Sequence, residues 1–120
     1  MKLIITFLSF FIFNISNAQN WMQSQILDRK FNQAVSNYNS GKFIVSEKII
    51  LEILSGEPGI YKEPSLLLLF KNEIALNKPL KAKSSANKFL FQFPESDYLP
   101  NIMESLGDLY VNETKYASAY

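Results

Sequence analysis

Turn-forming residues recur along this chain at a nearly constant spacing, and this repeat limits the fold more than any other feature. Gly41, Asn77 and Thr114 are separated by 36 and 37 positions. Pro58 and Pro94 are again 36 residues apart. A fixed period of this length is the signature of an array of similar two-helix units. The chain is therefore expected to be all-α, a series of antiparallel helical hairpins.

Each turn residue is followed by residues suited to helix packing. An aromatic residue or proline comes two positions later, and a small residue three positions after that: Phe43 with Ser46, Pro79 with Ala82, and Tyr116 with Ala119. A small residue lets two helices approach closely. Glycine or asparagine can take the left-handed backbone that ends a helix, and proline stops one. These sets predict where each hairpin turns and where its two helices touch.

A second small residue is expected on the first helix of each unit. Ala34 and Gly107 hold this place in the first and third units, whereas the second unit has the bulky Phe70. We therefore expect Gly107 to lie against a sixth helix, so that Gly107→Leu would overfill the contact and destabilise the fold.

These residues make the chain resemble the tetratricopeptide repeat family. The third unit matches best, at Leu106, Gly107, Tyr110, Tyr116 and Ala119. The first unit matches at Ala34, Tyr38, Gly41, Phe43 and Pro58, with Ser46 for the usual alanine. The second unit departs most, with Phe70 for the small residue and Pro79 for the aromatic one. The alternative is an ordinary helical bundle whose spacing arises by chance.

The resemblance covers residues 27–120. It implies a right-handed α-solenoid of stacked hairpins, with units at about 27–60, 63–96 and 100–120, the last one incomplete. The segment 93–98 also resembles the joints of bacterial periplasmic repeat proteins, among them outer-membrane assembly lipoproteins and cell-division coordinators that bind the Tol system. Because a sixth helix would end after about one and a half turns, we expect the sequence to be a fragment of a longer repeat protein or a truncated gene product.

Residues 1–18 have the three-part pattern of a secretory signal peptide. Lys2 precedes an 11-residue stretch, residues 3–13, that is apolar except for one threonine and one serine. Ser16 and Ala18 are the small residues that a signal peptidase needs, so cleavage is expected between Ala18 and Gln19. An uncleaved membrane anchor is the alternative, although the apolar stretch is shorter than the roughly 20 residues that span a bilayer.

Composition excludes several kinds of chemistry. The chain has no histidine and no cysteine, which removes Ser–His and Cys–His nucleophilic pairs, the usual zinc sites, disulfides and the lipid-anchoring cysteine of a lipoprotein. Without residues 1–18, it has 11 basic and 11 acidic side chains, so no strong attraction to nucleic acid follows. We expect no catalytic residue, no cofactor, no metal, no nucleic-acid partner and no lipid anchor.

Apolar spacing predicts the individual helices. After a loose lead-in over residues 19–25, the repeat domain should occupy residues 26–120. Helices are expected over about 23–39, 43–54, 64–75 and 79–93, then a fifth with Pro100 in its first turn and a sixth from near Lys115. The apolar stretch 66–70 predicts a third helix that is buried on most sides; a buried strand is the alternative.

In the resembled family, the first helices line a concave groove that binds extended peptides or partner helices. Here that face would present Asn32, Tyr38, Asn39, Lys71, Asn101, Glu104, Asp108 and Asn112. Asparagine can both donate to and accept from a peptide backbone, and a tyrosine offers flat apolar area. The positions where some members clamp a C-terminal carboxylate hold Phe31, Val35, Leu67 and Glu104 here, so that clamp is not expected. The alternative is a set of ordinary solvated side chains.

Charge is unevenly distributed. Residues 62–94 carry six lysines and two glutamates, whereas residues 95–120 carry five acidic residues and one lysine. This could orient a partner, or it could be two solvated faces. Glu104 and Asp108 lie one helical turn apart, and we regard a cation site or an acid–base pair there as the weaker interpretation.

The expected function is that of an exported, non-catalytic scaffold for protein–protein interaction. Its partner would be a protein or peptide in the periplasm or at the cell surface of a Gram-negative-like bacterium, and envelope complexes could bring it to a membrane. One alternative is the sensor or substrate-binding part of a longer enzyme or receptor whose catalytic region lies beyond residue 120. A second alternative is a structural spacer.

Overall fold

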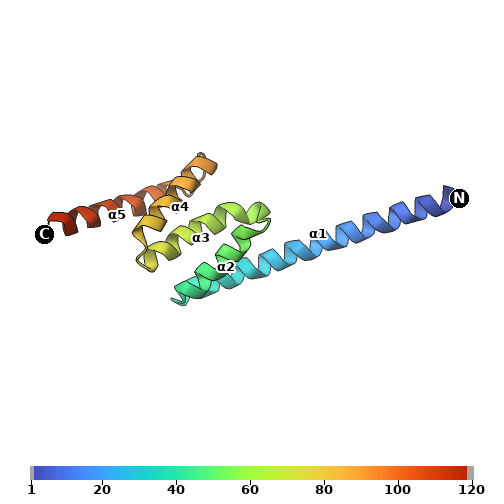
Figure 1. Ribbon diagram of the computed structural model, residues 1–120, viewed down its shortest axis with the longest axis horizontal. Helices are drawn as coiled ribbons and strands as arrows, with labels where there is room; N and C mark the ends of the chain where they lie inside the picture. The colour runs from blue at the N-terminus through green and yellow to red at the C-terminus, as the bar shows by residue number, and fades with distance from the viewer. Residues whose placement is uncertain (1, 119–120) are drawn as a thin grey trace.

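A computed structural model of the chain describes the backbone of residues 2–118 and the side chains of residues 18–114. Its elements are α1 (Lys2–Asn39), α2 (Phe43–Ser55), the short 3₁₀ helix η1 (Gly59–Tyr61), α3 (Lys62–Ala75), α4 (Pro79–Gln92) and α5 (Leu99–Ser118) (Figure 1). These described residues contain no strand, so the predicted all-α class is confirmed. The apolar stretch 66–70 lies in α3 and does not form the alternative strand.

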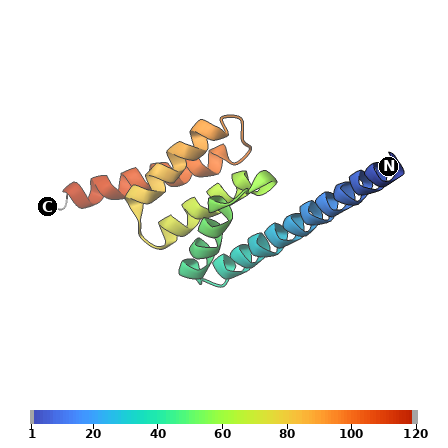
Figure 2. The same ribbon diagram turned by 45° about the vertical axis from the view of Figure 1, so that its right-hand side comes forward.

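Each α-helix packs against the next one in the chain. In both views, α1, α3 and α5 run in one direction, while α2 and α4 run back (Figures 1 and 2). The N-terminal half of α1 extends well beyond the other helices. None of the helices in the described residues combines the length and the apolar character that crossing a membrane requires.

The first two turns have the same backbone geometry. Gly41 and Asn77 both have positive φ, 78° and 57°. After each of them, a lysine N–H donates to a carbonyl five residues earlier at 2.8 Å, Lys42 to Asn37 and Lys78 to Glu73. This is the left-handed helix ending, in which backbone N–H groups after the turn donate to the last free carbonyl oxygens of the helix. The predicted turn residues of the first two units are therefore confirmed, 36 positions apart.

Helix α3 lies at the centre of the core, as its apolar run predicted. Towards α1 and α2, Leu68 joins a buried cluster with Ala34, Ile50 and Ile53. Towards α4 and α5, Phe70 joins a second cluster that also contains Leu66, Leu67, Ala82, Ala86, Phe89 and Ile102. Burying these side chains removes apolar area from water on both sides of α3 and is the main favourable term for the fold.

Helix α1 begins earlier than expected. Residues 19–25, expected as a loose lead-in, are part of α1. Trp21 lies in this part of α1 and has 63% of its surface exposed. The stretch before Gly41 contains neither glycine nor proline, and nothing in it interrupts the hydrogen bonding of a helix.

The third unit is not a hairpin, which corrects our expectation. Helix α5 continues through Thr114 to Ser118, so there is no turn at Thr114 and no new helix near Lys115. The Thr114 hydroxyl donates to the Tyr110 carbonyl, Oγ1 to O, at 3.0 Å within the same helix. The side chains of Tyr116 and Ala119 lie outside the described residues. A Cβ added at Gly107 would meet no atom within 4 Å, so the expected overfilling by Gly107→Leu is wrong.

Gly107→Ala should stabilise the protein by about 0.5–1 kcal/mol, because glycine inside an exposed helix costs backbone entropy. Urea unfolding followed by circular dichroism measures the change. Gly41→Ala is the matched control and should destabilise, because its φ of 78° strains a side chain. If Gly107→Ala destabilised the protein, another part of the molecule would have to cover α5 at this position.

Candidate functional site

Helices α1 and α3 border a groove of about 190 Å³. It is lined by Phe31, Val35, Tyr38 and Asn39 of α1, by Pro64, Leu67, Leu68 and Lys71 of α3, and by Tyr98 from the turn before α5. On each helix these residues recur every three or four positions, so they form one stripe along its surface. The lining is mainly apolar and includes three aromatic rings.

Two of the aromatic rings are held by neighbouring rings. The rings of Phe31 and Tyr61 have centroids 5.1 Å apart. The rings of Tyr38 and Phe43 pack edge to face with their centroids 5.4 Å apart. Phe43, the aromatic residue expected after the first turn, therefore does pack against α1. The Tyr61 hydroxyl donates to the Asp28 carboxylate, and this bond raises the pKa of Tyr61 because it favours the neutral phenol. These contacts within the chain hold the rings that line the groove, and such preorganisation lowers the cost of binding.

Tyr98 is positioned by a polar contact between α3 and the α4–α5 turn. The Ser96 hydroxyl donates to Glu63 Oε1 at 2.6 Å. The same hydroxyl accepts from the backbone N–H of Tyr98 at 3.1 Å. Glu63 lies in the first turn of α3, so the position of the turn is tied to α3. This places the Tyr98 ring, 39% exposed, at the edge of the groove.

The structure brings together three of the eight residues expected to line a groove. Tyr38, Asn39 and Lys71 lie along this groove. Asn32 lies instead on an exposed part of α1 beside Gln25, Asp28 and Arg29. The other four, Asn101, Glu104, Asp108 and Asn112, are exposed on α5 and are not among the lining residues. Ala18 and Gln19, the expected cleavage site, are exposed on α1.

Sequence reasoning missed most of the apolar lining. Phe31, Val35 and Leu67 are predicted as apolar helix residues at positions where the carboxylate clamp is lost, and not as part of a binding surface, although these same residues line the groove. Their helical spacing in phase with Tyr38 was the available signal. Pro64 and Tyr98 gave no such signal, because their position depends on how separate segments pack.

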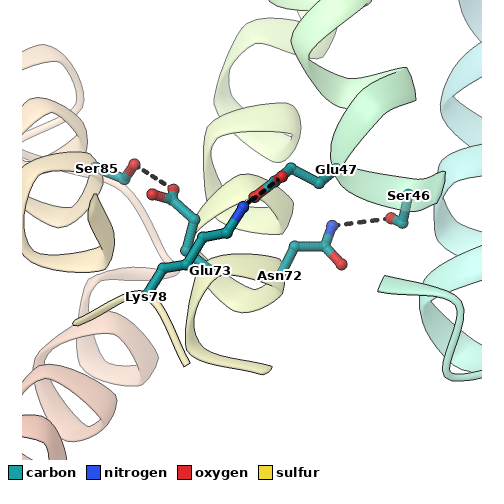
Figure 3. Close-up of polar contacts among 6 residues, drawn as sticks. All are labelled: Ser46, Glu47, Asn72, Glu73, Lys78 and Ser85. Atoms are coloured by element: carbon teal, nitrogen blue, oxygen red, sulfur yellow. Dashed lines mark hydrogen bonds and ion pairs between the residues drawn. The ribbon is translucent and has the colours of Figure 1, made fainter. Parts of the chain in front are cut away.

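A second candidate site is the polar cluster around the α3–α4 turn (Figure 3). Glu73 is only 3% exposed and accepts a hydrogen bond from the Ser85 hydroxyl. Lys78 Nζ donates to both carboxylate oxygens of Glu47, at 2.8 and 3.1 Å. Burial raises the pKa of Glu73, and the hydrogen bond from Ser85 opposes this effect.

This cluster joins helices, and its most buried carboxyl, that of Glu73, is closed to a substrate. The Glu73 carboxyl is covered by the protein and linked across to α4, whereas a general acid must reach the proton that it transfers. Glu104 and Asp108, the other carboxylate pair considered, are both exposed on α5. Within residues 18–114, no group of three or more acidic residues is placed to hold a metal ion. The groove is therefore the better candidate for a functional site.

Some of the lysines and acidic residues that make the charge distribution uneven form ion pairs between helices. Lys78 pairs with Glu47 of α2. Lys83 of α4 pairs with Glu113 of α5, and its ammonium lies 4.4 Å from the centre of the Tyr110 ring. The positive segment 62–94 and the negative segment 95–120 thus contact each other between α4 and α5. Charges that are paired in this way are not free to orient a partner.

Comparisons with protein-family models, with curated proteins and with solved structures find no match to this chain.

Glu73→Gln should change how stability depends on pH. A raised folded-state pKa means that the stabilising contribution of Glu73 is fully present below the ordinary pKa of glutamic acid and is lost as pH rises through the folded-state pKa. Glutamine stays neutral, so the variant should become more stable relative to the wild type as pH rises from the ordinary pKa of glutamic acid through the raised folded-state pKa. Urea unfolding at a series of pH values measures the difference. The exposed Glu57→Gln is the control, and a pH-independent difference for Glu73→Gln would contradict the assignment.

Proposed function

We propose that this chain is an exported, non-catalytic module that binds a polypeptide, with its helices arranged as tetratricopeptide-type hairpins. The two matching left-handed turns support this arrangement, as does the common direction of α1, α3 and α5. At the hairpin contact of each of the first two units, a buried small residue lies on the second helix, Ser46 in one and Ala82 in the other. On this interpretation, α5 is the first helix of a third unit.

The preformed groove between α1 and α3 is the observation that carries the proposal. Its lining is mainly apolar and includes three aromatic rings, two of them from tyrosine. Tyrosine is enriched among the residues that contribute most of the binding energy at protein interfaces. Its volume of about 190 Å³ is below the range of about 300–1,000 Å³ for small-molecule sites. A groove of this size suits one or two side chains of a polypeptide and does not suit a cofactor.

Export is proposed from the pattern of residues 1–18. The described residues that pack into the core clusters begin at Leu27. Cleavage after Ala18 would therefore leave both clusters intact, and the exposed Gln19 and Asn20 would follow the cut. The function would then be performed in the periplasm or at the cell surface.

The protein recovered from the cell envelope should begin at Gln19. N-terminal sequencing or intact mass spectrometry measures this. Ala18→Arg should block processing, because the peptidase needs a small residue there, while the exposed Gln23→Arg should be processed normally. Recovery of a chain that still begins at Met1 would support the anchor alternative and contradict cleavage.

Tyr38→Ala should weaken peptide binding by about tenfold or more, because a tyrosine at the centre of a contact often contributes more than 1.4 kcal/mol. Peptides would be selected from a displayed library of random 12-residue sequences against the protein as cells produce it, and their Kd measured by fluorescence polarisation. Phe91→Ala, at an aromatic residue that is 87% exposed on α4, is the matched control and should leave binding unchanged.

Circular dichroism should show equal helicity for both variants. Failure to select any peptide that depends on Tyr38 would contradict the proposed function.

A further inference from the structure

We propose that the groove recognises a specific polypeptide pattern: a large apolar side chain and, two residues away in an extended chain, a carboxylate. This inference rests on the proposed function and specifies the chemistry of its partner. It follows from the charge of the groove, from the order of residues along it, and from its size.

Lys71 is the one charged residue among the nine that line the groove. The ion pairs formed within the described residues involve Lys30, Lys78 and Lys83, and Lys71 takes part in none of them. Its side chain is exposed, so its ammonium is open to a ligand. An arriving carboxylate would meet an unpaired positive charge with no acidic residue in the lining to compete.

The lining has an apolar end and a polar end. On α3 the apolar Leu67 comes first, and Lys71 follows one helical turn later. On α1 the apolar Phe31 and Val35 come before the polar Asn39. Helices α1 and α3 run in the same direction (Figures 1 and 2), so the apolar part of the lining comes first on both helices and the polar part follows.

This order sets the spacing of the ligand. One turn of α3 separates Leu67 from Lys71, a rise of about 6 Å. In an extended peptide, side chains two residues apart lie on the same side and are separated by about 6.5 Å. An apolar ligand side chain against Leu67 therefore places one side chain two residues away, in one chain direction or the other, beside Lys71. The Asn39 amide can donate a second hydrogen bond to a carboxylate there.

Size and charge also exclude other partners. About 190 Å³ accommodates a large side chain but not a nucleotide. A nucleic-acid surface needs several cations along a backbone, whereas this groove offers one. A peptide with a basic residue in place of the carboxylate would bring a second positive charge close to the Lys71 ammonium.

The test uses the same displayed library of random 12-residue peptides, selected in parallel against the wild type and against Lys71→Glu. Wild-type selections should be enriched in Asp or Glu two positions before or after Leu, Ile, Met, Phe or Trp. Selections against Lys71→Glu should instead favour Lys or Arg at that position. Lys88→Glu, an exposed lysine of α4 outside the groove, is the matched control and should keep the wild-type preference.

A second measurement needs no protein variant. Replacing the acidic residue of a selected peptide by its amide should raise Kd about threefold or more, because one exposed ion pair is lost. Replacing an acidic residue elsewhere in that peptide should change Kd less.

The outcomes separate the two proposals. If selected peptides depend on Tyr38 but show no acidic preference, or if the amide peptide binds equally well, this inference is wrong and the proposed function stands. If no Tyr38-dependent peptide is selected, the proposed function fails and the inference fails with it. A reversed preference with Lys71→Glu, together with the weaker amide peptide, supports the inference.

Discussion

The structure depends on the close approach of three helices around one buried hydroxyl. Ser46 Oγ donates to the Ala34 carbonyl oxygen at 2.7 Å and accepts from Asn72 Nδ2 at 2.9 Å. All three residues have no exposed surface. The hydroxyl therefore joins α1, α2 and α3 at a point where a larger side chain would push the helices apart. The bond from Asn72 gives its amide nitrogen a partner, which a buried polar group requires.

The second hairpin packs with a different combination of large and small side chains. Phe70 occupies the place that corresponds to Ala34, and the small residues Ala82 and Ala86 of α4 lie in the same buried cluster as its ring. One large side chain against two small ones can fill this contact, because side chains in protein cores interdigitate with few voids. With α2 on one side of α3 and α4 on another, the remaining stripe of α3 lies beside α1. That stripe and the matching stripe of α1 form the groove, so the candidate site is a consequence of how the hairpins pack.

Much of the helical structure could be predicted because its causes are local. Gly41 and Asn77 end helices through their own backbone preferences, and Pro79 begins one for the same reason. The prediction failed at Thr114, where it relied on the repeat period and not on local chemistry. No glycine or proline lies between Gly107 and Ser118 to interrupt a helix, so the shorter-range preference for a continuous helix prevails.

The candidate site was only partly predictable. The sequence by itself determined the helical stripes of α1 and α3 and the single lysine at the end of one of them, because helical periodicity places residues three or four apart on one face. Only the tertiary structure decided that these two stripes face each other, that Glu63 and Ser96 bring Tyr98 to the same groove, and that Asn101 and Glu104 lie elsewhere. The physical reason is that contacts between distant segments depend on how helices cross and on which side chains fill the space between them, and neither is encoded in the spacing of residues along one helix.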